Sequence, residues 1–268
     1  MKFKKAFTPE HRPKAFKSSH SDNDQRVMGT HAVKASLEHM PKRAIKLNLV
    51  EDNPRLEPMA ALAKSKQIPI EFFKKHVFLE QFGDDVVHQG AVLMTQEFPY
   101  ADLDTFLENP PNLCVILDGI EDPRNLGRAA RSAFALGAQL LVIPKDRAAC
   151  ITAAAEKAAV GTLARLPVAQ VTNLNRAIES LKEAGLWVIG TAEDAPVAAW
   201  DCDLTKPIAL IIGNEEKGIR HLVAQKCDEL VSIPMHAHGL SLNAADAATV
   251  LLYETLRQRS CAIKRMKA

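Results

Sequence analysis

The sequence lacks several features that would place it in a specialised class of protein. No apolar run approaches the roughly 18 residues needed to cross a bilayer. The N-terminus, MKFKKAFTPEHRPKAFKSSH, lacks the apolar block of a secretory signal. The five cysteines form no C-x-x-C pair, which argues against a disulfide framework and a zinc ribbon. We therefore expect a cytoplasmic protein with reduced thiols, at Cys114, Cys150, Cys202, Cys227 and Cys261.

A strong charge of either sign is also lacking, since 34 Lys and Arg residues nearly balance 32 Asp and Glu residues. Bulk charge alone therefore does not indicate a nucleic-acid partner. Basic residues are nevertheless concentrated at both ends of the chain, where they could lie along phosphates or simply be solvated. They are Lys2, Lys4, Lys5, Arg12, Lys14 and Lys17 near the start, and Arg257, Arg259, Lys264, Arg265 and Lys267 near the end.

The residue pattern divides the chain into four segments. Residues 1–25 are polar, basic and weakly periodic, which predicts a disordered arm. Residues 26–96 predict a small α/β domain, with helices at 30–40 and 55–67 and strands at 44–51, 68–73 and 90–96. Residues 97–112, which contain Pro110-Pro111, predict a linker, and residues 113–268 predict a second α/β domain.

The second domain contains five strands that are apolar throughout, and helices alternate with them. The expected strands are LCVILD, AQLLVIP, LWVIGT, IALIIG and LVSIPM. Strands without polar alternation are buried on both faces, which indicates a mostly parallel sheet covered by helices. Ligands bind beyond the carboxyl ends of strands in such sheets. The expected helices are 126–136, 153–160, 173–184, 219–225 and 242–259.

The loop after the first of these strands reads LDGIEDPRNLGRAARSAFALG. Asn125 stands where a helix N-cap is expected. Arg128 and Arg131 are three residues apart, so both can project from one side of the helix. Two guanidinium groups near a strand end suit an anionic substrate such as RNA phosphate. A solvated face of arginines paired with Glu121 and Asp122 is the alternative.

Two further strands end in unusual loops. IALIIGNEEKGIR turns at Gly213 and Gly218 without the spacing of a phosphate-binding loop, so its glycines would let the backbone approach a bound ligand or simply form a turn. SIPMHAHGLSLN contains two histidines and a glycine turn before the last helix. Ser241 and Asn243 in it are both good N-cap residues, so capping alone could explain them.

Taken together and in this order, the three loops closely resemble the three motifs of the SpoU/TrmH class of SPOUT methyltransferases, which are AdoMet-dependent RNA ribose 2′-O-methyltransferases. The resemblance spans about residues 113–259. The segment VMGTHAVKASLE…VHQGAVL resembles the L30e-like RNA-binding domain of the RlmB-like branch, which methylates guanosine in 23S rRNA. The resemblance implies an α/β fold with a deep trefoil knot, a homodimer through the knotted domain, and an RNA substrate. A tRNA methyltransferase of the same class and a non-catalytic RNA-binding homologue are the alternatives.

The resemblance also implies roles for particular residues. Arg131 would stabilise the negative charge that builds on the ribose oxygen, since its own pKa is too high for a proton acceptor. Asn125, Glu215, Ser241 and Asn243 complete the expected catalytic set. The expected AdoMet contacts are Thr191, Ala192, Gly213, Asn214, Gly218, Ile233, Met235 and Leu242, and the expected RNA contacts are Arg124, Arg128 and His31.

Some residues depart from the family pattern. Ala244, Ala245 and Asp246 follow Asn243, whereas the family commonly has Val and Ser next and an apolar residue at the third position, and Arg128 stands where an aliphatic residue is common. His236 and His238 would need a third ligand to hold a metal, and no nearby residue has a recognisable spacing. We expect no metal, and we expect Ile233, Gly239, Leu242 and Asn243 to matter more than the histidines.

Overall fold

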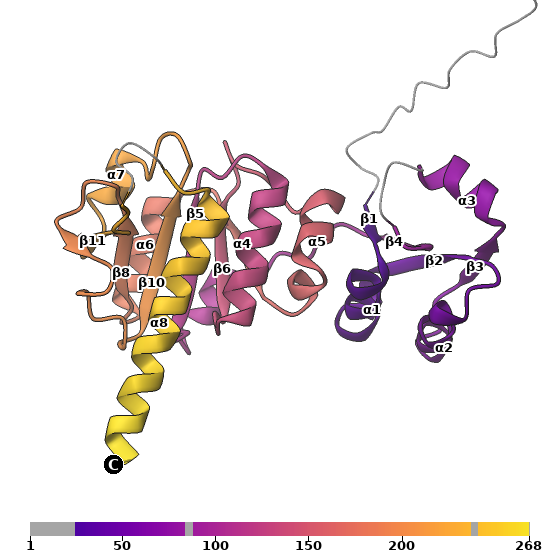
Figure 1. The fold of residues 1–268 in the computed structure, drawn as a ribbon, viewed down its shortest axis with the longest axis horizontal. Coiled ribbons are helices and arrows are strands. Elements are labelled where there is room, and N and C mark those ends of the chain that lie inside the picture. Colours follow the sequence, from indigo (N-terminus) through magenta and orange to yellow (C-terminus); the bar gives the residue numbers. More distant parts are fainter. Residues whose placement is uncertain (1–24, 84–87, 237–240, 268) are drawn as a thin grey trace, which may run out of the picture.

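The computed structural model describes residues 25–83, 88–236 and 241–267, the last three of them in backbone only. The arm predicted at residues 1–25 therefore lies outside the described residues except for Gln25, and so do His238 and Gly239. Figure 1 shows two α/β units side by side, with the C-terminal helix lying across one face of the larger unit.

The N-terminal unit is a four-stranded sheet in the order β1-β4-β2-β3, in which only β2 and β3 run parallel. Leu47, Leu49 and Leu93 point to the face covered by α1 and α2, whereas Val92 packs against Phe78 and Phe82 of α3. The elements are β1 (Arg26–Met28), α1 (Thr30–His39), η1 (Pro41–Arg43), β2 (Ala44–Val50), η2 (Pro54–Leu56), α2 (Glu57–Ser65), β3 (Ile70–Phe73), α3 (Lys75–Phe82) and β4 (Ala91–Thr95).

The second unit is built on a seven-stranded sheet in the order β7-β6-β5-β10-β8-β11-β9, and all its paired strands are parallel. The central strands β5 and β10 are buried along their whole length, as expected for strands covered on both faces. Its strands are β5 (Leu113–Asp118), β6 (Leu140–Pro144), β7 (Val168–Val171), β8 (Trp187–Thr191), β9 (Val197–Ala198), β10 (Ile208–Gly213) and β11 (Glu229–Ser232).

Helices cover both faces of this sheet and give it two apolar cores. Alternate residues of β5 separate them: Val115 packs with α4, α5 and α8, and Ile116 packs with α6 and α7. The segment before β5 includes η3 (Leu103–Phe106), which packs on the second core. The helices are α4 (Pro123–Ala135), α5 (Ala153–Ala159), η4 (Thr162–Ala164), α6 (Leu174–Glu183), α7 (His221–Ala224) and α8 (Ala244–Lys267).

The predicted fold class, an α/β protein with a mostly parallel sheet in its second domain, is confirmed. The knotted threading that the resemblance implies passes through the loop before α8, part of which, residues 237–240, lies outside the described residues. Among the described residues, no helix combines the length and apolar character of a membrane span.

Several element boundaries differ from the predictions. The C-terminal helix begins at Ala244 rather than at residue 242 and continues to Lys267. The sequence reading missed β1, α3, β7 and β9, and three of these are strands of two to four residues, too short to show a period. The predicted strands at 113–118 and 208–213 agree with β5 and β10 at both ends.

Candidate active site

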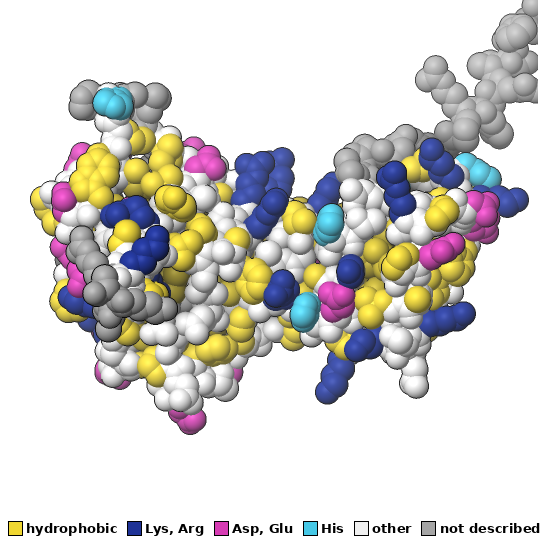
Figure 2. Space-filling view, turned by 60° about the horizontal axis from the view of Figure 1, so that its bottom comes forward, with side chains coloured by type: hydrophobic (Ala, Val, Ile, Leu, Met, Phe, Trp, Pro, Cys, Tyr) yellow, Lys and Arg dark blue, Asp and Glu magenta, His cyan; other side chains and the backbone are white. Residues whose placement is uncertain are grey.

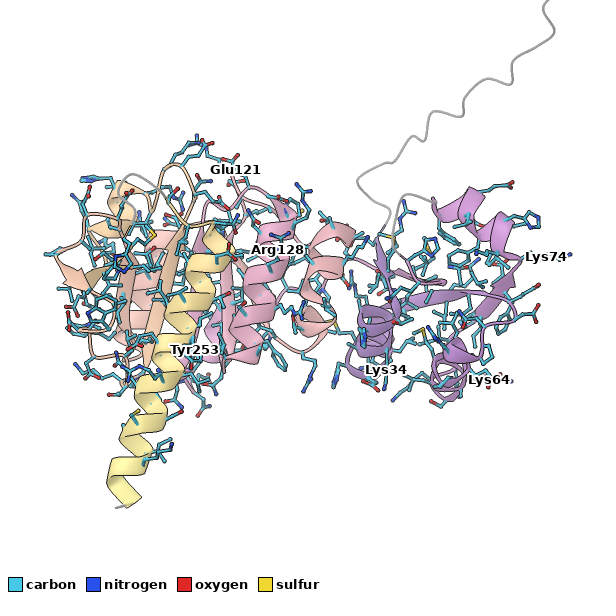
Figure 3. All side chains as sticks on the ribbon, viewed as in Figure 1. Lys34, Lys64, Lys74, Glu121, Arg128 and Tyr253 are labelled. Carbon is cyan, nitrogen blue, oxygen red and sulfur yellow. The ribbon has the colours of Figure 1, made fainter. Side chains whose placement is uncertain are left out.

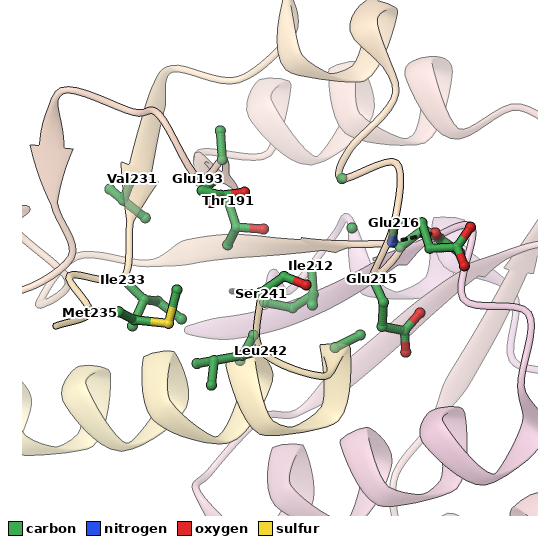
Figure 4. A pocket seen from close by; sticks show the side chains of 16 residues that line it. Thr191, Glu193, Ile212, Glu215, Glu216, Val231, Ile233, Met235, Ser241 and Leu242 are labelled. Carbon is green, nitrogen blue, oxygen red and sulfur yellow. Dashed lines mark hydrogen bonds between the residues drawn. The ribbon is translucent and has the colours of Figure 1, made fainter. Parts of the chain in front are cut away.

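A pocket opens at the carboxyl ends of β8, β10 and β11, beside the start of α8 (Figure 4). Its lining is largely apolar, with carboxylates added by Glu193, Glu215 and Glu216. The position is the one expected for a ligand site of a parallel sheet. The lining residues are Thr191, Ala192, Glu193, Ile212, Gly213, Asn214, Glu215, Glu216, Gly218, Val231, Ile233, Met235, Ser241, Leu242, Ala244 and Ala247.

All eight residues that the sequence suggested as AdoMet contacts lie around this one pocket. They come from three separate loops: Thr191 and Ala192 follow β8, Gly213 to Gly218 follow β10, and Ile233, Met235 and Leu242 flank the loop before α8. Ser241 and Glu215 of the suggested catalytic set line it as well.

Gly213 is required by the protein's own backbone. A Cβ atom at this position would lie 2.3 Å from the carbonyl carbon of Gly218 and 2.4 Å from the nitrogen of Ile219. The returning chain thus explains this glycine by the alternative of a turn, and since Gly213 also lines the pocket, its expected contact with a ligand stays a prediction. Gly218 differs, since a Cβ would meet nothing within 4 Å and its positive φ of 64° explains the glycine instead.

The loop after β10 is fixed by hydrogen bonds at both ends. The backbone groups of Asn214 and Gly218 exchange two hydrogen bonds of 3.0 and 2.9 Å, and the Asn214 side-chain amide donates to the carbonyl of Gly119 at 3.0 Å. Further along, the buried carboxylate of Asp118 accepts from the backbone N–H and from the guanidinium of Arg220, at 2.9 and 2.7 Å. The pocket wall is thus held rigidly against the end of β5.

Glu215 joins the three motifs. Its Oε1 accepts a 2.6 Å hydrogen bond from the side-chain amide of Asn125, on α4, and a longer one of 3.5 Å from the amide of Asn243, which precedes α8. These three residues are 90 and 28 positions apart in the chain. The structure therefore brings Asn125, Glu215 and Asn243 to one point at the rim of the pocket.

Asn125 is not the N-cap of α4, and that prediction is wrong. Pro123 begins the helix, and the carboxylate of Asp122 caps it by accepting from the Arg124 N–H at 2.8 Å. Hydrogen bonds from Arg124 hold the pKa of Asp122 below its ordinary value. Because Asp122 caps the helix, the Asn125 side chain remains available for Glu215.

Asn243 and the three residues after it, which depart from the family pattern, have defined places in the structure. The Asn243 side-chain oxygen accepts from the Ala245 N–H at 3.0 Å and so caps α8, while its amide reaches Glu215. Ala244 and Ala245 are buried in the larger core. Asp246 is exposed in the first turn of α8, where a carboxylate is favourable. Ala244 also lines the pocket, and the hydrogen bonds from Asn125 and Asn243 to Glu215 are made with these residues in place.

The arginines of α4 do not line the pocket. Arg124 pairs with Asp122 at 3.1 Å, whereas the alternative interpretation of this helix had paired Arg128 and Arg131 with Glu121 and Asp122. Arg128, labelled in Figure 3, and Arg131 are exposed, and neither forms an ion pair or hydrogen bond with another described residue. His31, at the start of α1, is also exposed and lies on the other unit.

Sequence reasoning missed part of the site. Ile212, Val231, Glu193 and Glu216 line the pocket, yet only their positions at strand ends could have indicated them. His236 is exposed and does not line the pocket. In the part of the chain that the structure describes, no group of three or more His, Cys, Asp or Glu residues could hold a metal ion.

Comparison with protein families gives two matches that divide the chain as its two units do. The model of the SpoU rRNA Methylase family matches residues 112–253. The model described as RNA 2′-O ribose methyltransferase substrate binding matches residues 26–101. The first match covers the sheet, the pocket and all three motif loops.

Curated and solved relatives agree with the family match. The chain is 41% identical over 244 residues to the 23S rRNA (guanosine-2′-O-)-methyltransferase RlmB of Pseudomonas syringae pv. tomato, covering 88% of this chain and 96% of the relative. The corresponding Escherichia coli protein is 37% identical over 242 residues, covering 87% and 98%. The SpoU methyltransferase AviRb of Streptomyces viridochromogenes in complex with AdoMet superimposes with a TM-score of 0.76 at 28% identity, covering 88% and 91%.

Proposed function

This chain belongs to the SpoU rRNA methylase family, and we propose that it transfers the methyl group of AdoMet to the 2′-hydroxyl of a guanosine ribose in 23S rRNA. The observation that carries the proposal is the junction at Glu215, where residues of all three motif loops meet beside one pocket. The match of residues 26–101 to a substrate-binding family supports RNA as the partner. An rRNA substrate also implies that the enzyme acts in the cytoplasm.

The residues that line the pocket suit the chemistry of AdoMet. Ile212, Val231, Ile233 and Leu242 offer apolar contact for a flat adenine ring, in a cleft beyond the strand ends. The backbone groups of Ile233 and Leu242 make no hydrogen bond to another described residue, so they can hold polar edges of the ligand. Exposed carboxylates such as that of Glu216 suit a cationic methyl donor. When bound, AdoMet supplies an electrophilic methyl carbon and a neutral leaving group.

We propose that Arg131 acts on the RNA rather than on the donor. A ribose hydroxyl becomes negatively charged as its proton leaves, and a guanidinium held close by stabilises that charge. Arg131 is exposed and has no ionic partner among the described residues, so its charge is available to a substrate. The junction of Asn125 with Glu215 anchors the first turn of the same helix to the pocket rim.

We also propose that the protein forms a homodimer through α8. Val250, Tyr253 and Ile263 of this helix are 44%, 62% and 54% exposed, an unusual amount of apolar surface for one helix. Figure 3 shows Tyr253 on the outer side of α8. We expect Tyr253→Glu to convert the dimer to a monomer, which light scattering coupled to gel filtration would measure. An unchanged mass would refute this interface.

Such a dimer would bring Arg131 near the pocket of the partner subunit. The neighbouring Ser132 hydroxyl lies 2.7 Å from that of Thr249 on α8, so Arg131 is close to the proposed interface. We propose that it serves the pocket of the partner subunit. Mixed dimers of Arg131→Ala and Gly213→Ala chains would then regain activity, because one intact pocket faces one intact arginine. Mixed dimers without activity would show that each chain uses its own arginine.

The substrate is tested in cells that lack the gene. We expect one guanosine ribose methylation to disappear from 23S rRNA and to return when the wild-type gene is restored. Mapping of 2′-O-methylation across rRNA and tRNA measures this. Loss of a tRNA methylation, with rRNA unchanged, would contradict the proposed substrate.

A further inference from the structure

A buried ion pair connects the two units. Arg43, at the end of η1 in the N-terminal unit, donates from Nη1 to Oε1 of Glu156 on α5 at 2.5 Å. Their side chains are only 5% and 9% exposed. The two residues are 113 positions apart, so the pair exists only when the units are in contact.

The other nitrogen atoms of the Arg43 guanidinium also have partners. Its Nε donates to the carbonyl of Gln96 at 2.8 Å, its Nη2 donates to Gln25 at 3.4 Å, and the group lies 5.3 Å from the centre of the Phe98 ring. Burial raises the pKa of Glu156, and the charge of Arg43 opposes that shift. The charge of Arg43 is therefore satisfied from several directions in this one arrangement.

The energetics of such a pair favour one orientation more than they favour tight association. When the units separate, water solvates both charges again, so the net stabilisation of contact by the pair is small. Any other close arrangement would bury one charge without its partner, which is strongly unfavourable. The pair thus selects a single way for the units to meet.

Three further contacts restrict the same interface. A Cβ atom at Gly161 would lie 2.7 Å from the Ala35 Cβ and 3.0 Å from the His31 carbonyl, so α1 approaches the chain after α5 closely. Met40 packs against the larger core of the methyltransferase unit. The hydroxyl of Tyr100 accepts from the Ile151 N–H at 3.0 Å, just before α5 begins.

The helix that carries Glu156 also packs on the helix that carries the arginines. A Cβ atom at Gly127 of α4 would lie 2.2 Å from the carbonyl oxygen of Ala155, the residue before Glu156. Figure 1 shows α5 between α4 and the N-terminal unit. The orientation of the N-terminal unit is therefore set against the helix that presents Arg128 and Arg131.

We propose that Arg43 and Glu156 are positioning residues for the RNA, which lock the substrate-binding unit so that both units contact one RNA as a single rigid surface. This inference rests on the proposed function, because it assumes an RNA that spans both units. Figure 2 shows basic side chains on both sides of the contact, on the same face of the molecule. A freely tethered unit would lose orientational entropy when it binds RNA, whereas a locked unit has already lost it.

The experiment compares the full-length wild type with Glu156→Gln, Arg43→Gln and the double variant. We expect each single variant to raise KM for a structured 23S rRNA fragment about tenfold, since each leaves one buried group unpaired. The kcat at saturating RNA and the Kd for AdoMet should stay within about twofold, because neither residue touches the pocket. The double variant should raise KM no further than the worse single variant, because the two residues act through each other.

Small-angle scattering gives a second readout. We expect the variants to show a broader distribution of distances between the units than the wild type. Lys46→Gln is the matched control, since it removes an exposed ion pair with Glu71 in the same unit, and it should change neither KM nor scattering. If the single variants do not fold, Arg43→Met with Glu156→Leu replaces the pair by apolar side chains, and it should fold yet still raise KM.

Unchanged KM and scattering in a folded variant would overturn the proposal, and so would a loss confined to kcat. If the wild type transfers no methyl group to RNA while the variants still broaden the scattering distribution, the proposed function fails and the locked orientation stands. A raised KM for RNA with unchanged scattering would show that the residues contact RNA directly, which would also overturn the positioning role.

Discussion

The pocket that we propose for AdoMet and the arginine face of α4 are built on opposite principles. The pocket is lined by backbone and by largely apolar side chains, and internal hydrogen bonds such as those of Asn214 hold it in place. The arginine face consists of long, exposed side chains, and neither Arg128 nor Arg131 forms a salt bridge or hydrogen bond with a described residue, although the charge of Arg128 contributes to the lowered pKa of Asp122. Asn125, on the same helix as the arginines, connects the two regions through its hydrogen bond to Glu215.

We propose that this difference reflects two different ligands. A small cofactor of constant shape suits a pocket that is formed before binding, since little ordering remains to oppose affinity. RNA brings its own phosphates and a developing negative charge, and unpaired guanidinium groups bind both. Substitutions on the two sides should therefore separate donor binding from reaction with RNA.

The largest expected effect comes from the arginine face. Arg131→Ala should lower kcat for RNA methylation by about 10²- to 10³-fold, since it removes a charge that stabilises the reacting oxygen. The Kd for AdoMet, measured by calorimetry, should not change. Lys226→Ala is the control, because it removes an exposed cation that pairs with Glu179 away from α4. Full turnover by a folded Arg131→Ala enzyme would remove this residue from the mechanism.

Substitutions in the pocket should have the opposite result, with weaker binding of AdoMet and unchanged binding of RNA. Gly213→Ala forces the backbone of Gly218 and Ile219 to move, and we expect the Kd for AdoMet to rise by roughly 10- to 100-fold. Gly218→Ala meets no atom and strains only φ, so its effect on Kd should be smaller. RNA binding by both variants should equal that of the wild type in a filter-binding assay. Equal effects of the two substitutions would show that steric contact is not the reason for Gly213.

Substitution of Glu215, which lies where the two regions meet, should lower activity by an intermediate factor. Glu215→Ala removes the acceptor for Asn125 and Asn243, and we expect kcat/KM to fall about tenfold, in line with loss of a charge-assisted hydrogen bond. Glu215→Gln keeps an oxygen acceptor and should lose about threefold or less. If the glutamine variant is as impaired as the alanine variant, the charge of Glu215 matters and not its role in joining the loops.

The smallest expected effect concerns how strongly ligand binding to the two regions depends on salt. Arg128→Ala should weaken RNA binding a few-fold and reduce the slope of log K against log salt by about one. Binding of AdoMet should depend less on salt than binding of RNA, because it releases no counterions from a phosphate backbone. A variant with an unchanged salt slope would show that Arg128 does not contact phosphate.

The parts of this account that the sequence could predict depend on local patterns. Continuous apolar runs predicted β5 and β10 at the right residues, because burial on both faces leaves a clear signal. The eight suggested pocket residues came from motif resemblance, and they meet only because the strand order places β8, β10 and β11 side by side. Short strands such as β9 left no signal.

Other features depend on long-range contacts that no local pattern shows. The N-cap of α4 was assigned to Asn125, since the sequence does not show that Asp122 takes this role and that Asn125 instead reaches Glu215. The close approach of Gly213 to the chain that returns through Gly218 could not be seen in the sequence, which left a ligand contact and a turn as alternatives. The pair of Arg43 with Glu156 joins two units and could not be seen in either alone.

The most direct test of the central claim identifies the methylated atom. Purified protein, labelled AdoMet and rRNA from cells that lack the gene are incubated together, and the RNA is digested to nucleosides. We predict that the label appears in 2′-O-methylguanosine from 23S rRNA. Label on a base, or no transfer by protein that binds AdoMet, would contradict the account.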